Sequence, residues 1–557
     1  MVNIFCFIKG GFKMNFMEAY DRNQQIMNNL TFTENGANAL KSTTSAVLDL
    51  FVKAPSMLKP NDDDIEELKS LIRTAIEEDP QLTLKCIFYL GDIREGAGVR
   101  KVFTESIRLL AEEYPKMLKF VLPQIPEFSR WDVLVKSLLY TDFEDAITEI
   151  IRYQLETDLK STTPSLCAKW LPSPSSSSKN TRKLGRRLSH LLNFSGKKLT
   201  GDPDIDKEIK KEDNILFSKI LTRLRKDLDI VEHYIATIDY DKIDYSKVPS
   251  VALNRYQSLF LKYDNARFMK WVYEAAEGKA KINSKRLYPF EIIKNILDNS
   301  LHFLYIRNEN RISMTKAFLA DAQWKNMEDV IEGKELNWLV MADVSGSMED
   351  YDNIPIATSI ATAIYCAEKT QGVFHNKFMT FSKKPEIVDI KGDTICEKVE
   401  NAYRANWGFN TDLEKAFDLI LEVAVNNKLK QEELPQTLLI ISDMEFDEAR
   451  GQYYYHDNED SKTLFKEIQE KFNKYGYEMP TCVFWNVNAD VKFPVDSEEK
   501  GCILLSGYSN NNFRALLGAD LIQEEPHLID TTEKVTVTPY ESMVSILNSE
   551  RYEKIVF

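Results

Sequence analysis

The sequence is poor in cysteine and has no long apolar run. Its 557 residues include seven cysteines, with no Cys-x-x-Cys pair and no Cys/His cluster, so neither a disulfide framework nor a zinc site is indicated. An odd number without framework spacing favours a reducing compartment. No apolar stretch reaches the length of about 20 residues that crosses a membrane, and Met1–Lys9 is too short for a signal peptide. We therefore expect a cytoplasmic protein.

The sequence also lacks net positive charge and catalytic signatures. A net charge of −15 and a pI of about 5.2 argue against a generally basic nucleic-acid-binding protein, although a local basic face remains open. The six histidines are widely separated, and no Walker-type glycine-rich phosphate loop is present. We therefore expect a protein that is not an enzyme.

The hydrophobic pattern predicts two domains of different class. In residues 17–334, apolar residues recur at helical spacing, as in Ile65–Ile76, and successive helices form antiparallel pairs typical of a HEAT-like α-solenoid. In residues 335–557, short apolar strands alternate with helices, which predicts a doubly wound, mostly parallel sheet. The expected fold class is α + α/β.

A basic stretch interrupts the helical pattern at about residues 160–212, a Ser/Pro-rich insertion. Five cations fall within the ten residues Lys179–Leu188. Such cations bind a phosphate backbone without reading its sequence. The stretch therefore offers Arg182, Lys183, Arg186 and Arg187 as candidate RNA contacts. The alternative is a solvated helix face with no ligand.

A second group of polar residues follows apolar strands of the second domain. Leu339–Ala342 runs directly into Asp343-x-Ser345-x-Ser347, and the later strand Thr437–Ser442 ends at Asp443. Between them, a loop supplies Thr411 before a helical pattern. In open α/β sheets, ligands bind beyond the carboxyl ends of the strands, and oxygen ligands suit Mg²⁺. The alternative is that these small polar residues only cap a helix.

Together, these three segments resemble the metal-ion-dependent adhesion site of von Willebrand factor A domains, which have a doubly wound, Rossmann-like fold. The resemblance implies that Ser345, Ser347 and Thr411 are hydroxyl ligands of a divalent cation, and that Asp343 and Asp443 are direct or water-mediated ligands. Mg²⁺ is the expected ion, with Mn²⁺ or Ca²⁺ as substitutes.

The first domain resembles the TROVE module of Ro autoantigens. The residues that carry this similarity are Thr33–Ala37, Ser42–Phe51, Asp92–Arg100 and Ser129–Asp132. A TROVE module followed by a von Willebrand A domain is the order found in Ro proteins. The elements Ser165–Pro172 and Ser442–Asp447 are also similar to a Ro-like family of unknown function.

The resemblance to Ro implies a helical ring that the second domain helps to close, and RNA, structured or with single-stranded ends, held by the cations of the repeats. It adds Arg94, Arg100 and Lys101 to the candidate RNA contacts. The sequence departs from the Ro pattern at Gly91, Ala97 and Val99, where a cation or an acid is usual, which weakens the assignment of that turn.

Two functions of different class remain open. The first is a non-enzymatic, Ro-like RNA-binding protein. The second is a metal-dependent scaffold for protein–protein interaction without RNA binding, in which an Asp or Glu of a partner completes the coordination of the ion. Because the two sites lie in different domains, the functions are compatible.

Overall fold

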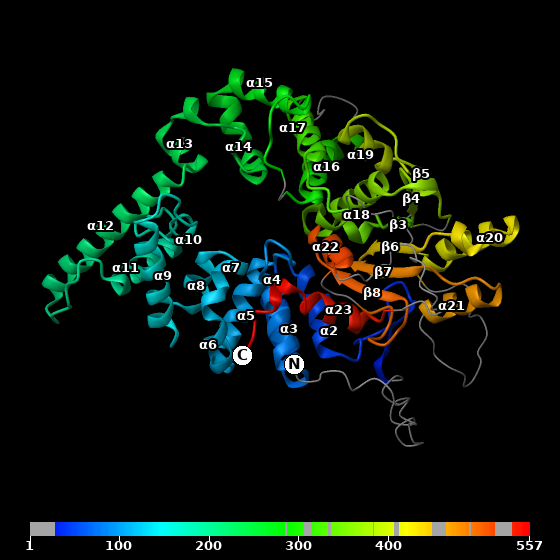
Figure 1. The fold of residues 1–557 in the computed structure, drawn as a ribbon, viewed down its shortest axis with the longest axis horizontal. Coiled ribbons are helices and arrows are strands. Elements are labelled where there is room, and N and C mark those ends of the chain that lie inside the picture. Colours follow the sequence, from blue (N-terminus) through cyan, green and yellow to red (C-terminus); the bar gives the residue numbers. More distant parts are fainter. Residues whose placement is uncertain are drawn as a thin grey trace, which may run out of the picture.

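The structure is a computed structural model that describes residues 28–284, 287–305, 314–331, 336–381, 384–405, 412–447, 464–488, 492–518 and 537–557. The part before residue 331 is helical apart from one small hairpin, and the part after residue 336 contains a six-stranded sheet with helices (Figure 1). This confirms the predicted succession of a helical part and an α/β part. No helix in the described ranges is long and apolar enough to cross a membrane.

The first strands of the described part form a two-stranded antiparallel hairpin, β1 (Leu30–Phe32) and β2 (Asn38–Leu40), which is followed by α2 (Ala46–Lys53). The next helix, α3 (Asp62–Glu78), starts at a reciprocal capping box between Asn61 and Asp64 and buries a stripe at helical spacing. The helices that follow are α4 (Pro80–Gly91), α5 (Arg100–Glu113), α6 (Pro115–Val121), α7 (Ile125–Phe128), α8 (Trp131–Leu138) and α9 (Glu144–Asp158).

The stretch from about 160 to 212 continues this array with helices. It contains α10 (Cys167–Trp170), α11 (Lys179–Leu192) and the first part of α12 (Pro203–Asp227). Ser178 caps α11 by accepting a hydrogen bond from the backbone N–H of Thr181. The helical part is completed by α13 (Val231–Thr237), α14 (Ser250–Tyr263), α15 (Asn265–Ala276), α16 (Pro289–Tyr305) and α17 (Met314–Lys325).

The sheet has the strand order β5-β4-β3-β6-β7-β8 and is parallel except at β5. From β3 the chain moves outward to β4 and β5, and then returns to add β6, β7 and β8 on the other side. The winding therefore reverses between β3 and β6, which is the point where ligands bind in doubly wound sheets. The strands are β3 (Trp338–Ala342), β4 (Lys377–Thr380), β5 (Ile387–Asp389), β6 (Thr437–Ser442), β7 (Thr481–Asn486) and β8 (Cys502–Ser506).

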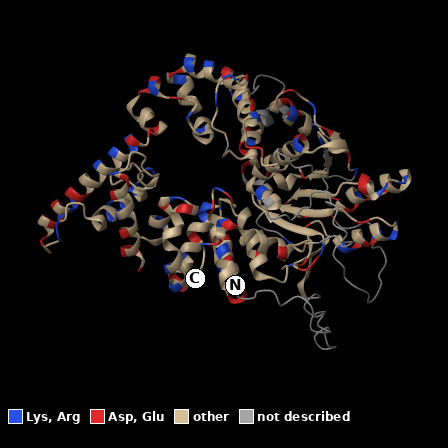
Figure 2. Ribbon diagram, in the orientation of Figure 1, with Lys and Arg blue, Asp and Glu red and all other residues tan. Residues whose placement is uncertain are grey.

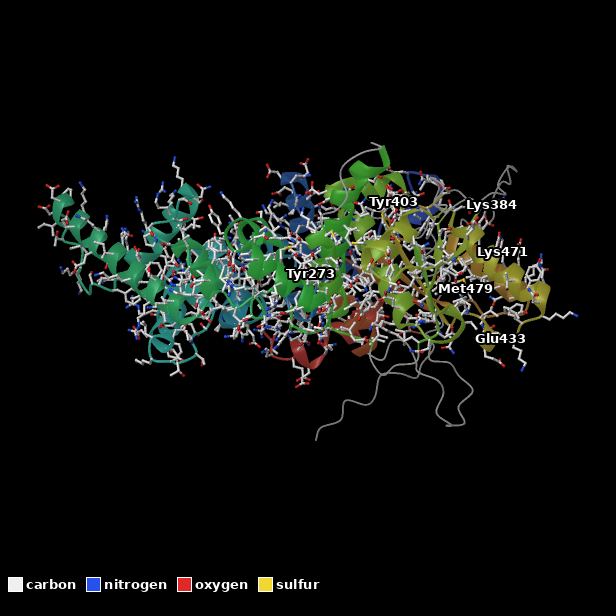
Figure 3. All side chains as sticks on the ribbon, turned by 90° about the horizontal axis from the view of Figure 1, so that it is seen from above. Tyr273, Lys384, Tyr403, Glu433, Lys471 and Met479 are labelled. Carbon is white, nitrogen blue, oxygen red and sulfur yellow. The ribbon has the colours of Figure 1, made fainter. Side chains whose placement is uncertain are left out.

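Helices cover this sheet at close range. Small buried residues of α18 (Asp350–Lys369), among them Ala357, Ala361 and Ala363, let this helix pack against β3, β4 and β6. Lys471 of α21, labelled in Figure 3, pairs with Glu414 and Asp418 of α20. The remaining helices are α19 (Ile395–Tyr403), α20 (Leu413–Asn427), α21 (Leu464–Lys474), α22 (Asn511–Gly518) and α23 (Pro539–Leu547).

The helical part forms an arc whose two ends both contact the α/β part (Figure 1). At one end, α2 packs on β8 and α23, and α4 also packs on α23; at the other end, α16 packs on α18. One hydrophobic core runs through both parts, and a second, smaller core lies under α13, α14, α15 and α17. Seen from above, the helical part extends to one side of the sheet as a long, flat body (Figure 3).

Residues near the C-terminus contact the first end of the arc and hold it in place. Arg551 donates hydrogen bonds to both carboxylate oxygens of Asp92, at 2.8 and 3.0 Å, and the Tyr552 hydroxyl lies 3.3 Å from the same carboxylate. Asp92 is fully buried. A Cβ at Gly96 would lie 2.2 Å from the Tyr89 carbonyl oxygen, so only glycine fits there. The turn Asp92–Arg100 therefore has a structural role in closing the arc.

We predict that Arg551→Ala strongly destabilises the protein, because it leaves the Asp92 carboxylate buried without its partner. Removing one member of a buried ion pair costs roughly 3–5 kcal/mol. The matched control is Lys554→Ala, since Lys554 pairs with Glu127 at a half-exposed position, where the cost is about 0–1 kcal/mol. Chemical denaturation measures both; equal losses of unfolding free energy would contradict the assignment.

Candidate functional site

The register of the central strands brings two aspartates together at the carboxyl edge of the sheet. Ala342 of β3 pairs with Ile441 of β6, and the ladder continues as the Asp343 N–H donates to the Ile441 carbonyl at 3.0 Å. Asp343 and Asp443 thus leave neighbouring strands at the point where the winding of the sheet reverses. Apolar strands buried on both faces fix this register.

Hydroxyl groups connect the two aspartates. The Ser442 hydroxyl donates to Asp343 Oδ2 at 2.6 Å and lies 3.4 Å from Asp443 Oδ1. The Ser345 N–H donates to Asp343 Oδ1 at 2.8 Å, and the Ser345 and Ser347 hydroxyls are 3.1 Å apart. Four of the five predicted metal ligands therefore come from two adjoining loops. Ser442 is a further oxygen of this cluster that the sequence did not single out.

Thr411, the fifth predicted ligand, lies outside the described residues. The described chain resumes at Asp412, whose carboxylate caps α20 by accepting from the Lys415 N–H at 3.1 Å. Burial raises the pKa of Asp412, and the charge of Asp447 raises it further. Because Asp447 is only four residues beyond Asp443, the start of α20 lies near the same loop.

The electrostatics of the two aspartates fit a bound cation. Asp343 is fully buried and Asp443 is 1% exposed. Burial first, and then the charge of Asp443, raises the pKa of Asp343 to about 7. Asp443 Oδ2 is buried and has no hydrogen-bond partner within the described ranges. Two buried carboxylates with an unsatisfied oxygen and nearby hydroxyls suit a hard divalent ion such as Mg²⁺.

The loop after Asp443 is held by the N-terminal hairpin. The Thr33 hydroxyl donates to the Phe446 carbonyl at 2.6 Å, and the Asn35 amide donates to the Glu445 carbonyl at 2.7 Å. The Glu445 carboxylate accepts from the Glu34 N–H and pairs with Lys492 at 3.3 Å. Glu445 thus positions the loop, and the described residues contain no cluster of three His, Cys, Asp or Glu that could form a second metal site.

The candidate RNA contacts at the start of α5 have mixed environments. Arg94 is exposed, whereas the Lys101 ammonium donates to the Pro60 carbonyl at 2.5 Å and is used within the fold. Desolvation lowers the pKa of Arg100, and the nearby charges of Arg130 and Arg255 lower it further. Because Arg255 belongs to α14, cations from the two sides of the arc approach each other here.

On α11, two of the four candidate cations have partners. Arg182 donates to the carbonyls of Ser176 and Ser177 at 2.8 and 3.3 Å, and Arg187 pairs with Glu144. Lys183 and Arg187 also lie over the ring of Tyr140, an exposed aromatic side chain. Arg186 faces the opposite side, toward α12.

Arg186 is one wall of a groove between α11 and α12, with a volume of about 1360 Å³. The described lining contains six Lys and Arg side chains and one acidic residue; it has no Phe, Tyr or Trp. Figure 2 shows Lys and Arg residues on both α11 and α12, interspersed along α12 with Asp and Glu residues. The six cations are Arg186, Lys207, Lys210, Lys211, Lys219 and Arg223.

The groove lysines of α12, from Lys207 to Lys219, were not predicted, although the sequence carries a signal for them. The groove residues of α12 include Lys207, Lys210, Lys211, Asn214, Ser218 and Lys219, which recur every three or four residues and therefore share one helix face. Acidic residues next to them in the sequence, such as Glu208 and Glu212, offset the lysines when charges are summed along the chain, so the sum does not reveal the basic face. A helical projection of residues 203–227 separates the two signs.

His190 also lines this groove, from α11. Burial lowers the pKa of His190, and the charges of Lys210, Arg187 and Arg186 lower it further, against the opposite effect of Asp213. Its Nδ1 atom is buried without a hydrogen-bond partner in the described part of the chain. The groove therefore combines excess positive charge with an imidazole whose pKa is lowered by burial and by neighbouring cations.

These features define a protein in which a helical arc is closed by a mixed α/β domain carrying a carboxylate–hydroxyl cluster. Residues 33–130 and 140–335 match a family described as a domain of unknown function, DUF2828, and residues 337–549 match a second domain of unknown function, DUF7788. The first match covers more than half of the chain, so the chain belongs to the DUF2828 family.

One curated relative is the uncharacterized protein L728 of Acanthamoeba polyphaga mimivirus. It is 27% identical over 558 residues, which cover 92% of this chain and 89% of the viral protein. Among solved structures, the Ro (RSR) protein of Deinococcus radiodurans matches with 14% identity and a TM-score of 0.46, over 85% of this chain and 99% of that one.

For the metal centre, we predict that Mg²⁺ raises the melting temperature of the protein and that Asp343→Asn abolishes the rise. Because this variant also removes repulsion between two buried carboxylates, its melting temperature in chelator should equal or exceed that of the wild type. The control is Asp389→Asn, an exposed position on β5, which should keep the Mg²⁺ response. A wild-type melting curve that Mg²⁺ does not change contradicts the site.

Proposed function

We propose that this protein is a non-enzymatic RNA-binding protein of the Ro type, in which the helical part holds RNA by its phosphate backbone. The observation that carries the proposal is the groove between α11 and α12. It gathers six cations in a chain whose net charge is −15. The TROVE-like segments of the first domain support the same function.

Phosphate is the chemistry that this groove suits. Arg186, Lys207, Lys210 and Lys219 form no ion pair with an acidic residue of the described chain. The groove therefore presents unneutralised cations, and RNA binding would release counterions from the phosphates. Its lining has no aromatic side chain for stacking, so recognition in the groove depends on backbone and shape.

Tyr140 supplies the complementary feature on the other face of α11. Its side chain is 55% exposed, and the cations of Lys183 and Arg187 lie 5.7 and 5.6 Å from its ring centroid. An exposed ring between cations can stack on an unpaired base. This arrangement favours RNA that combines a structured region with a single-stranded end.

In the second part of the proposal, the α/β domain is a von Willebrand A domain whose adhesion site binds a divalent ion. A competing function is a metal-dependent interaction scaffold without RNA binding. It is favoured by the unsatisfied oxygen of Asp443, since an ion held there could take a further carboxylate from a partner protein. Binding that requires Mg²⁺ and is independent of the groove cations would identify this function.

We predict that replacing Lys207, Lys210 and Lys219 together by Ala weakens RNA binding and its salt dependence. Each lost phosphate contact should reduce the slope of log K against log salt by about 0.7 for a single strand. The control replaces three exposed cations elsewhere, Lys116, Lys119 and Lys270. Fluorescence anisotropy with a labelled RNA measures both slopes. An equal change of slope in the two variants contradicts the assignment of the groove as the RNA-binding surface.

A second prediction concerns pH. Because the pKa of free His190 is lowered and bound phosphates raise it, RNA binding takes up a proton. Affinity should therefore rise as the pH falls from about 7.5 to 5.5, around the ordinary histidine pKa of about 6.5. His190→Gln should make RNA affinity nearly independent of pH over this range. The triple lysine variant should keep part of the pH dependence, because it retains His190. A wild-type affinity that is constant over this range contradicts the prediction.

A further inference from the structure

A second, smaller pocket lies between α8, α10, α11 and α12, on another side of α11 from the cationic groove. Its volume is about 510 Å³, within the range of small-molecule sites. Two sequence elements that are far apart meet at its edge, since the guanidinium of Arg130 lies 3.7 Å from the ring centroid of Trp170. The stretch Leu171–Ser177 supplies the wall nearest to α11.

The walls of this pocket are held in place by specific contacts. Arg225 of α12 donates to the carbonyls of Ala168 and Leu171 at 2.8 and 2.9 Å, which fixes the turn that presents Trp170. A Cβ at Gly185 would lie 2.5 Å from the carbonyl carbon of Ser173. Glycine is thus needed at this position for the loop to lie against α11, so the pocket is a built feature of the fold.

The pocket carries more positive than negative charge. Arg130 and Lys136 share the carboxylate of Asp132, at 2.5 and 2.6 Å. Burial would raise the pKa of Asp132, but the hydrogen bonds from these two cations outweigh it and lower the pKa. Lys169 pairs with Glu232 at 3.6 Å. Among the lining side chains, three cations, Lys136, Lys169 and Arg225, therefore face one acid, Asp132.

Arg225 is the cation without an acidic partner in the described chain. Its guanidinium donates hydrogen bonds to two carbonyl oxygens, which carry no full charge. Burial lowers its pKa, and no carboxylate opposes this effect. A largely buried cation without a counterion is costly, so this wall of the pocket favours an anion.

The rest of the lining matches a phosphate group and an organic part attached to it. The lining includes the hydroxyls of Ser173, Ser175 and Thr181, which can donate to phosphate oxygens. Trp170, Val135 and Leu184 add apolar surface to the same lining. An anion without an organic part would leave this apolar surface exposed to water.

We infer that this pocket binds a phosphomonoester, whose two negative charges balance the two excess cations and whose organic part packs against Trp170. The phosphomonoester has two possible sources, a free mononucleotide or sugar phosphate and the 5′-terminal phosphate of an RNA chain. The site is separate from the α11/α12 groove and does not depend on the function proposed for it.

The test is calorimetric titration of the full-length protein with AMP, ribose 5-phosphate and adenosine. AMP should bind, ribose 5-phosphate more weakly, and adenosine not at all. Lys136→Gln and Lys169→Gln should each weaken AMP binding about tenfold, the effect of losing one charge-assisted hydrogen bond. The matched control is Lys226→Gln, the exposed residue next to Arg225 that does not line the pocket; it should bind AMP normally.

Two oligonucleotides that differ only in carrying a 5′-phosphate or a 5′-hydroxyl show whether the phosphomonoester is the end of an RNA chain. Tighter binding of the phosphorylated one, lost in Lys169→Gln, supports the RNA end even if AMP binds weakly. Failure of all phosphorylated probes, or equal binding of adenosine and AMP, overturns the inference. A loss of AMP affinity in Lys226→Gln that equals the loss in Lys136→Gln and Lys169→Gln also overturns the inference. The Lys207, Lys210 and Lys219 triple variant should still bind AMP, so failure of the groove is distinguished from failure of this pocket.

Discussion

The closure of the helical arc on a single α/β domain is the constraint on which the other features depend. Stacked helices bury their apolar faces only against neighbours, and the two ends of an open arc would leave such faces exposed. Here β8 and α23 cover one end and α18 covers the other. Closure also fixes the loop at Glu445, because the residues that hold it belong to the first hairpin of the chain. The geometry of the loop after Asp443 thus depends on contacts with residues more than 400 positions earlier in the sequence.

Charge is distributed unevenly over this frame. Most of the acidic excess is dispersed, whereas cations collect on the facing sides of α11 and α12 and around Trp170. The carboxylate–hydroxyl cluster has the opposite character, with Asp343 and Asp443 buried side by side. Cations thus gather in the helical part and buried carboxylates in the α/β part. Under the proposed function, this separation would let a polyanion and a cation bind to one chain at different places.

The order of elements and the proximity of Asp343 to Asp443 were predictable from the sequence. Continuous apolar runs identify β3 and β6 because strands buried on both faces need them, and the acid after each run then falls at the sheet edge. The α12 face was missed because its lysines alternate with acids along the chain. The structural role of the turn Asp92–Arg100 was missed for a different reason. The Asp92 carboxylate binds Arg551 and Tyr552, more than 450 residues away, and no local pattern reveals a partner at that distance.

The reach of the C-terminal residues has a consequence for how the chain acquires its structure. The first helices bury their apolar side chains against β8 and α23, and Asp92 finds its counterion only at Arg551. During synthesis, the first helices therefore emerge with part of their core uncovered and stay so until the segment that contains β8, α23 and Arg551 has left the ribosome. Emergence of this late segment, rather than the folding of successive modules, then triggers closure of the arc. Early termination would yield a product that chaperones and proteases recognise.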